Sequence, residues 1–339
     1  MSDLHKPGAV LDYPMGGMGS LANALVSGLE RHGGQIALNS RVDKLLLKEK
    51  DGKAVCEGVV LSNGKKIYAR KGVVSNAPIW NMVTMLQNSL PLEETRSIDA
   101  VTEAVNKIKK TADEMEMTGS FMHLHLGIPS DNLPDDLECH HSILNFDEDV
   151  TAPQNLVIIS IPTVFDPSLA PPGYHIVHAY TAASEDFAEW DSLVNDIDGA
   201  SSPSTSKARS YNKNPEYEAL KAEKSEALWK AVECVIPDVR KRVKEPGSIE
   251  LIATPLTHRR YNLRHRGTYG PAPPEGKDVW ELVGSTTPID GLLACGDTCF
   301  PGIGLPGVAA SGTIAANTMV NVGKQLELMN ELKEKGALQ

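Results

Sequence analysis

The spacing of apolar side chains predicts a helix followed by several short strands in the first eighty residues. Between Leu21 and Leu29 the apolar residues recur every three or four positions, and Gly33-Gly34 ends this helical pattern. Two dipeptides, Asp51-Gly52 and Asn63-Gly64, then separate apolar runs that alternate with polar residues. Such dipeptides favour tight hairpin turns. We therefore predict a β-meander that returns to a buried strand ending at residues 75–78.

Helical and strand patterns alternate through the rest of the chain, which predicts a mixed α/β (α+β) fold. A helix is predicted from Pro215, with Asn214 as its N-cap, and Pro237 ends it. A low-complexity loop, 199–210, precedes that helix. The other predicted elements are a helical stretch at 80–118, strands at 119–128, 157–161 and 176–180, and a strand, glycine loop and helix from 291 past 320.

Composition limits the function classes. The 339 residues carry 33 basic and 44 acidic side chains, a formal charge of −11, which argues against a nucleic-acid partner. The length predicts two domains. No apolar run approaches the ~20 residues of a membrane-spanning helix, although contact with a membrane surface stays open. No signal or transit peptide is visible, and the five scattered cysteines are expected to be reduced thiols.

The most informative segment runs from Gly291 to Val320. It combines a short apolar strand, a loop rich in glycine and proline, and a helix of small residues. Glycines let the backbone approach a flat or anionic ligand, and a helix N-terminus presents free amides to it. Asp297 could accept hydrogen bonds from ribityl or ribose hydroxyls. A tight strand–helix junction without a ligand explains the same pattern equally well.

A second glycine loop satisfies the spacing of a dinucleotide fingerprint without its context. Gly17, Gly19 and Ala22 fit G-x-G-x-x-A, but residues 11–14 are a poor strand and Asn39 replaces the expected acidic residue. We interpret this loop as an accessory cofactor contact or as simple packing.

Two further clusters are candidate sites. His123 and His125 alternate on a predicted strand and could bind a metal with a third ligand, but such pairs usually serve packing, so no metal site is predicted. The arginines between Arg259 and Arg266 fit either an ion-paired loop or a phosphate contact. The chain contains neither a G-x-S-x-G nucleophile elbow nor a P-loop motif.

Several stretches resemble the phytoene desaturase and carotenoid isomerase family. The segment Cys295–Gly312 resembles the closing FAD-binding motif of that family. The stretch Tyr13–Leu21, followed by an amphipathic helix, His32-Gly33-Gly34, a strand and Val42, also resembles the family. Ile159–His175 and Thr257–Pro271 resemble the carotenoid isomerase-like branch more specifically. Together these stretches extend from Asp12 to about Val322.

The resemblance implies a two-domain FAD enzyme of the amine-oxidase superfamily, with a glutathione-reductase-like cofactor domain interrupted by a substrate domain. It assigns residues 8–80 and 284–325 to the cofactor domain, 81–283 to the substrate domain, and 326–339 to a tail. It also implies that Val42 meets the adenine side of FAD through its main chain and that Asp297 binds the ribityl–phosphate region. The remaining implied contacts, to the pyrophosphate and the flavin edge, are Gly296, Gly302, Gly304, Gly307, Val308, Ala309 and Ser311.

Family members open with a strand–GxGxxG–helix unit that holds the ADP half of FAD, and this chain is expected to be the portion that follows it. The implied activity is cis–trans isomerisation or desaturation of a hydrophobic polyene, with no residue assigned as catalytic. The alternatives are a non-catalytic fragment of such an enzyme and an FAD oxidoreductase acting on a non-carotenoid substrate. The resemblance implies a plastid location, and the alternative is the cytoplasm. It leaves the substrate and the oligomeric state open.

Overall fold

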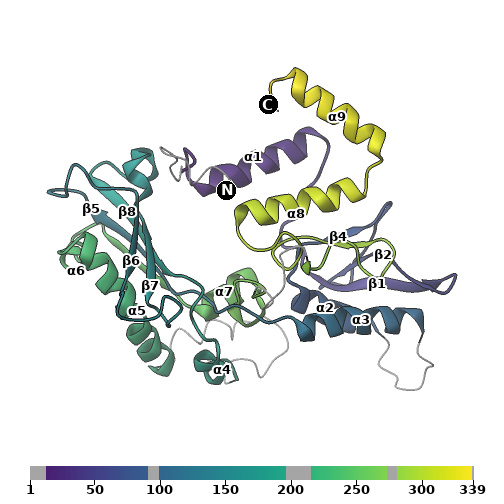
Figure 1. Cartoon of the computed structure of the whole chain (residues 1–339), viewed down its shortest axis with the longest axis horizontal. Coiled ribbons are helices and arrows are strands. Elements are labelled where there is room, and N and C mark those ends of the chain that lie inside the picture. The colour runs from purple at the N-terminus through teal and green to yellow at the C-terminus, as the bar shows by residue number, and fades with distance from the viewer. Residues whose placement is uncertain (1–12, 91–98, 196–214, 273–280, 338–339) are drawn as a thin grey trace. The chain divides into compact units, whose positions relative to one another are not determined.

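The computed structural model describes residues 13–90, 99–195, 215–272 and 281–337. The chain divides into two compact units. Unit 1 comprises residues 1–37 and 119–267, and unit 2 comprises residues 38–118 and 268–339. Figure 1 labels their elements. Among the described residues, none of the helices combines the length and the apolar character that crossing a bilayer requires.

Unit 1 is built on a five-stranded antiparallel sheet with the order β6-β7-β8-β5-β9. Every neighbouring pair is antiparallel, and β5 lies between β8 and β9. The side chains of β5 alternate strictly between buried and half-buried positions, so one face of the sheet is the core face. The strands are β5 (His123–Pro129), β6 (His140–Leu144), β7 (Leu156–Ser160), β8 (Tyr174–Thr181) and β9 (Ile249–Ala253).

Helices cover the core face of this sheet. The longest is α5 (Pro215–Val235), whose Leu228 and Val232 are fully buried in the same apolar cluster as Leu124 and Val177 of the strands. Trp190 from α4 (Ala188–Asn195) is buried in that cluster as well. The remaining short elements of the unit are 3-10 helices at Pro162–Val164, Pro167–Leu169 and His265–Gly267, α6 (Val239–Arg242) and α7 (Pro255–Asn262).

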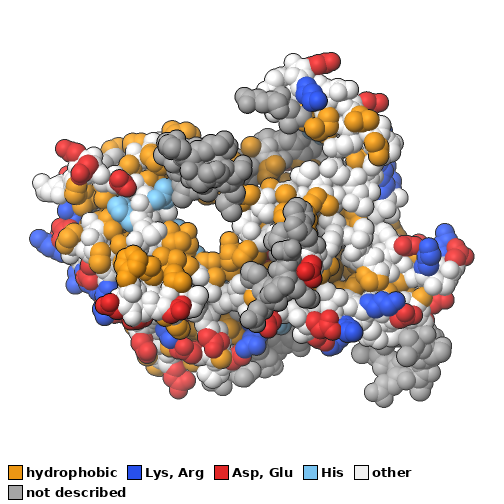
Figure 2. Space-filling view, viewed as in Figure 1, with side chains coloured by type: hydrophobic (Ala, Val, Ile, Leu, Met, Phe, Trp, Pro, Cys, Tyr) orange, Lys and Arg blue, Asp and Glu red, His pale blue; other side chains and the backbone are white. Residues whose placement is uncertain are grey.

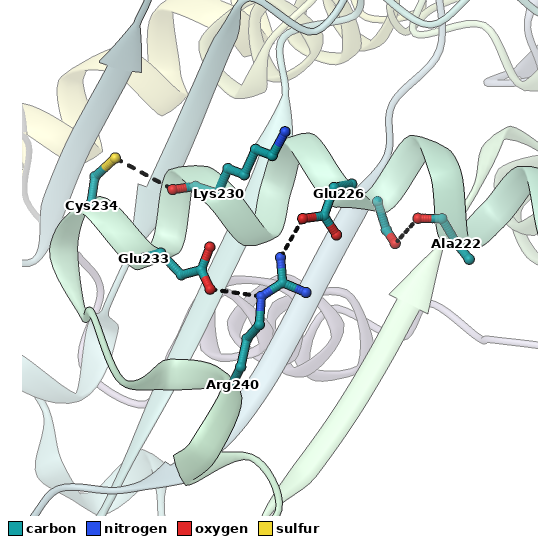
Figure 3. A network of polar contacts seen from close by, with 7 residues as sticks. Ala222, Glu226, Lys230, Glu233, Cys234 and Arg240 are labelled. Carbon is teal, nitrogen blue, oxygen red and sulfur yellow. Dashed lines mark hydrogen bonds and ion pairs between the residues drawn. The ribbon is translucent and has the colours of Figure 1, made fainter.

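A polar network joins α6 to α5 (Figure 3). Arg240 donates from Nε to Glu233 Oε1 at 2.7 Å and from its terminal nitrogen to Glu226 Oε1 at 2.6 Å. Its guanidinium also lies 5.1 Å from the ring centroid of Trp229. Glu226, Trp229 and Glu233 lie within two helical turns of α5, so a single arginine bridges the two helices.

The first helix, α1 (Met18–Arg31), buries none of its residues although its apolar side chains share one face. The turn before it is anchored to a distant part of unit 1, because the Gly16 amide donates to Asp166 Oδ2 at 2.7 Å. Gly17, at φ +76°, is the N-cap. The helix lies where the sequence predicts it, and residues 13–17 before it contain no strand.

Unit 2 contains two small sheets. In the antiparallel one, β1 (Val42–Lys50), β2 (Lys53–Leu61) and β3 (Lys66–Tyr68) follow in order, which confirms the predicted meander. Its first turn has Asp51 and Gly52 at φ +52° and +73°, as a type I′ hairpin requires. The other sheet pairs β4 (Val73–Ser75) with β10 (Leu292–Ala294) in parallel.

Helices flank these strands on two sides. The helices α2 (Ile79–Gln87) and α3 (Ala100–Glu114) pack on β1 and β2 and contribute Leu86, Val105 and Ile108 to the core of unit 2. On the other side of the strands lies α8 (Leu305–Thr318), which is followed by α9 (Val322–Glu334) (Figure 1). Only Ser311 and Ala315 of α8 are buried.

The mixed α/β class is confirmed, and three local predictions need correction. The helix predicted over residues 80–118 is two helices, and the intervening residues 91–98 lie outside the described part. Strand β4 is not buried, since Val74 is 41% exposed, and it pairs with β10 instead of extending the meander. Strands β6 and β9 were not predicted.

Asn214 and the loop 199–210 lie outside the described residues, so the predicted N-cap and loop stay predictions. The same holds for the division into cofactor and substrate domains at 80, 283 and 325. The two compact units are defined by contacts within the chain, whereas the predicted domains are defined by function.

Candidate functional site

The turn after β10 is a backbone junction with little room for side chains. β10 continues its parallel pairing through Cys295, whose amide donates to the Ser75 carbonyl at 2.9 Å. Gly296 follows with φ +101°, a conformation that side-chain-bearing residues rarely adopt. A Cβ atom at Gly296 would stand 2.4 Å from Asn76 Oδ1. The positive φ of Gly296 and the position of the Asn76 side chain both favour glycine where the ends of β4 and β10 meet.

The loop that follows brings the predicted glycines against one another. The Gly302 amide donates to the Cys299 carbonyl at 2.8 Å and so closes a tight turn. Gly302 and Gly304 have φ +106° and +93°. A Cβ atom at Gly307 would stand 2.5 Å from the Gly302 carbonyl oxygen, so the first turn of α8 packs directly on the loop backbone.

Helix α8 begins after a residue without a side chain. Its N-cap is Gly304, which makes no side-chain cap, and a Cβ atom at that residue would meet no atom of the described residues within 4 Å outside its own local backbone. Leu305 and Gly307 carry amides in the first helical turn, which have no acceptor within a helix. These amides and the positive end of the helix dipole favour an anion at this terminus.

Ser311 fixes the helix to the strand end. Its buried Oγ accepts from the Gly296 amide at 3.1 Å. Val308 is half-buried and Ala309 exposed, so this part of the helix is open to a ligand on the side away from the strands. The structure thus brings together Gly296, Gly302, Gly307 and Ser311 of the predicted set.

Val42 lies at the same end of the strands as the glycine loop. It begins β1 and pairs with Leu61 at the end of β2. Residue 290, just before β10, bridges Val55 of β2 in parallel. The strands β2 and β10 run in the same direction, and Leu61 at the end of β2 and Gly296 after β10 both come after that bridge. Val42, which pairs with Leu61, therefore lies at the same end of the strands as Gly296. The adenine contact assigned to Val42 stays a prediction.

The two cysteines of the loop are not reactive groups. Burial raises the pKa of Cys299 to about 12 and also raises the pKa of Cys295. The nucleophilic form of cysteine is the thiolate, so neither side chain is a nucleophile at neutral pH.

A small apolar cavity of about 90 Å³ lies beneath the junction, between the loop and the helices α2 and α3. Ala294 of β10 and Thr298 and Cys299 of the loop line it together with Met82 and Ile108 of the helices. The cavity is on the side of the strands opposite α8, so it is separate from the open helix N-terminus.

Sequence reasoning missed Asn76 as part of this junction. Its side-chain oxygen takes the space that a Cβ atom of Gly296 would occupy, yet 220 positions separate the two residues. The available signal was Ser75-Asn76-Ala77-Pro78 at the end of a predicted strand. Gly270 is a second missed neighbour, because its Cβ position lies 3.6 Å from Asp297 Oδ2.

The other candidates fall in unit 1. Arg266 donates to Asp191 Oδ2 at 2.7 Å, as an ion-paired loop would require. The fingerprint-like loop at Gly17 packs near Leu169. His123 and His125 share one face of β5, as the alternation predicts.

Similarity to known proteins covers nearly the whole chain, although no family model matches it. The chain is 36% identical over 322 residues to the chloroplastic prolycopene isomerase of Daucus carota, a match that covers 94% of this chain and 45% of that protein. The chain is homologous to the prolycopene isomerases. The Arabidopsis thaliana protein of the same name is 34% identical over 324 residues, with 94% of this chain and 46% of that protein covered.

More distant matches follow. A lycopene-forming phytoene desaturase of Pseudescherichia vulneris is 28% identical over 172 residues, covering 48% of this chain and 31% of that protein. Among solved structures, an oxidoreductase from Methanosarcina mazei aligns with a TM-score of 0.49 and 18% identity over 88% of this chain and 54% of that one. The chain spans about half the length of the curated relatives it matches.

Proposed function

We propose that the chain functions in an FAD-dependent isomerase or oxidoreductase that acts on a hydrophobic polyene. The observation that carries this proposal is the bare junction from Gly296 to Gly307, in a chain homologous to prolycopene isomerases over 94% of its length. Two relatives carry names that refer to carotenoid isomerisation and desaturation.

The residues present fit the flavin cofactor. Its pyrophosphate is an anion, and the first amides of α8 are donors at the positive end of a helix dipole. Its ring system is flat, and among the described residues nothing outside the local backbone lies within 4 Å of the Cβ position of Gly304. When bound, FAD would supply the electronic chemistry on the polyene. Leu305 and Gly307 would hold its phosphates by their amides, and Asp297 would accept from its hydroxyl groups.

The substrate side of the proposal rests on the low polarity of the loop. Phe300 is the one aromatic side chain between Gly296 and Gly312, and the remaining residues there are small, aliphatic or hydroxylated apart from Asp297. An aliphatic and glycine surface suits a long hydrocarbon chain better than an amine, which aromatic rings bind through cation–π contact. Plastid location, peripheral membrane contact and the absence of a nucleic-acid partner stay predictions, the first in keeping with relatives named chloroplastic.

The first experiment titrates the purified chain with FAD and follows flavin fluorescence. We expect saturable binding, and we expect Ala309→Leu to weaken it at least about tenfold, since 1.4 kcal/mol of lost contact is tenfold in affinity. Ala316→Leu is the matched control, because Ala316 is also exposed and lies two turns further along α8. Equal binding by all three proteins, or no binding by the wild type, would contradict the proposed site.

The second experiment incubates the flavin-loaded protein with a cis-polyene such as prolycopene and separates the products by chromatography and mass. Isomerisation yields a product of unchanged mass. Desaturation removes two hydrogens for each new double bond and passes two electrons to an acceptor. A non-catalytic chain would bind FAD and leave the polyene unaltered, an outcome that favours the alternative in which this chain acts only as part of a longer enzyme.

A further inference from the structure

A cluster of histidines lies on the sheet of unit 1, whereas the proposed flavin site belongs to unit 2. His123 and His125 are two positions apart on β5, and His178 lies directly opposite His125 on β8. Residues two apart on a strand and residues facing each other across a strand pair share one face of the sheet. The three imidazoles therefore project from the same side of β5 and β8.

That side is the sheet face opposite the hydrophobic core. Leu124 and Leu126 of β5 point into the core with Val177 of β8, and the histidines alternate with them. In Figure 2, histidine side chains reach the surface over β5 and β8 beside a hydrophobic patch. None of the three histidines belongs to the buried core cluster, and they are half-buried or exposed.

The nitrogen atoms converge closely. His123 Nδ1 and His178 Nε2 are 2.9 Å apart, and one nitrogen from each of the three histidines lies within 4.8 Å of the others. Ligand nitrogens about 2.0–2.1 Å from a tetrahedral zinc ion lie about 3.3 Å from one another. That spacing lies within the 4.8 Å range of the three nitrogens. The rings stack with interplanar angles of 6° to 15°, so each would have to turn to direct its nitrogen lone pair at a common ion.

The cluster also leaves polar atoms unsatisfied. His123 Nε2 is buried and has no hydrogen-bond partner among the described residues. The same is true of Nε2 of His258, on α7, whose ring centroid is 4.9 Å from that of His123. A buried nitrogen without a partner costs about 1–3 kcal/mol. His123 therefore keeps a ring nitrogen whose hydrogen-bonding capacity no described residue meets.

The imidazoles are in the form that binds metals. Burial and the neighbouring histidines lower the pKa of His123 to about 2, and burial with the charge of His125 lowers the pKa of His178 to about 4. Burial lowers the pKa of His125 as well. All three rings are thus neutral at physiological pH, and neutral imidazole is the metal-ligating form. Imidazole donors suit zinc, copper, nickel and iron.

We propose that His123, His125 and His178 form a binding site for one divalent transition metal ion, with zinc as its simplest occupant. Three protein ligands leave the fourth tetrahedral position open, toward the side of the sheet away from the core. His258 stands beside the site as a neighbour of His123. Sequence spacing places only the β5 pair on one face, and the pairing of β5 with β8 shows which of the other histidines joins it.

The test is a calorimetric titration of the metal-free chain with Zn²⁺ in a non-coordinating buffer. We expect one ion per chain with micromolar or tighter affinity. The double variant His125→Ala/His178→Ala should lose at least tenfold in affinity. The matched control is His141→Ala, which removes a histidine from β6 of the same sheet whose Nε2 contacts the Glu138 carbonyl instead. Circular dichroism of each variant verifies that the sheet is folded.

A second measurement keeps the test independent of stability. Co²⁺ in place of Zn²⁺ should give the strong visible absorption of a tetrahedral site in the wild type and in His141→Ala, and lose it in the double variant. Failure of the wild type to bind Zn²⁺, or equal binding by the wild type and the double variant, would overturn the proposal. Neither result depends on FAD, so the flavin proposal stands or falls separately.

Discussion

Gly296 is the position in the candidate site where a single methyl group should do the most damage. An added Cβ atom would stand 2.4 Å from Asn76 Oδ1, and φ +101° is itself unfavourable for any other residue. We expect Gly296→Ala to lower the free energy of unfolding by about 1–3 kcal/mol, since strained backbone and a steric clash add. Urea denaturation measures the change.

Gly312→Ala is the matched control in the same segment. Gly312 lies inside α8, and a Cβ atom there would meet no described residue within 4 Å outside the helix's own backbone. Alanine is the better helix former, so this variant should gain up to about 1 kcal/mol. If Gly296→Ala and Gly312→Ala changed the free energy of unfolding equally and in the same direction, the junction would tolerate a side chain. Close packing would then not require its glycines.

Glu185 should make the stability of the protein depend on pH. Its buried carboxylate accepts from Gln154 Nε2 at 2.8 Å, and burial raises its pKa above the ordinary value of 4.5. The folded protein therefore prefers the protonated carboxyl. The free energy of unfolding falls as the pH rises from 4.5 through the raised pKa, because Glu185 loses its proton at a lower pH in the unfolded chain than in the folded protein. Glu185→Gln should remove this fall and melt at a higher temperature than the wild type at neutral pH.

Asp238→Asn supplies the comparison with the opposite sign. The Arg242 side chain donates to Asp238 Oδ1 at 2.7 Å and lowers the pKa of that carboxyl. The stability it contributes is present above the ordinary Asp pKa and lost as pH falls through the lowered value. Thermal melts from pH 4 to 8 should show Glu185→Gln gaining stability and Asp238→Asn losing it at neutral pH. A parallel response of the two variants would contradict the assigned directions.

At this scale the glycines of the candidate site could be predicted, but their partners could not. Gly296, Gly302, Gly304 and Gly307 stand out because glycine and proline punctuate the sequence locally. Asn76 contributes through a contact between distant parts of the chain, and no local pattern marks it. The pair His123 and His125 shows the same limit, since the alternation of β5 identifies two histidines and only strand pairing adds His178.

The element that depends most on one side chain is α6, which has only four residues. Arg240 ties it to α5 through Glu226 and Glu233 and by contact with the Trp229 ring. We expect Arg240→Gln to lower the free energy of unfolding by about 1–2 kcal/mol, because half-exposed ion pairs and cation–π contacts contribute about 1 kcal/mol or less each. Lys241→Gln makes the same charge change outside this network. Its free energy of unfolding should stay within about 0.5 kcal/mol of the wild-type value.

Elements with strong periodic patterns were predictable, and weakly patterned ones were not. The helix α5 and the hairpin at Asp51-Gly52 combine clear apolar spacing with helix-start or turn residues, and both were found. Strand β9 was missed because its first three residues are exposed, so it lacks the alternation of a half-buried strand. The helix predicted over 80–118 ignored the polar and proline-containing stretch 88–98, where the pattern is interrupted.

For the molecule as a whole, the chain order does not reveal which segments share a core. The buried cluster of unit 1 draws all its members from residues 122–256, and that of unit 2 draws its members from 45–112 and 289–299. The second grouping joins segments more than 170 residues apart through the parallel pairing of β4 with β10. Similarity to a family with an interrupted domain was needed to anticipate that these two segments share a core. No short-range signal in the sequence indicates which strand β10 pairs with.

Two separate clusters imply that core substitutions act locally. Leu86 of α2 and Leu228 of α5 are both fully buried, one in each cluster. Replacing either with alanine should cost about 2–5 kcal/mol in its own unit. Hydrogen exchange should then accelerate in α2, α3 and β1 for Leu86→Ala, and in α5, β5 and β8 for Leu228→Ala, since exchange reports the local opening free energy. Acceleration of both sets in either variant would instead show that the two clusters open as one cooperative body.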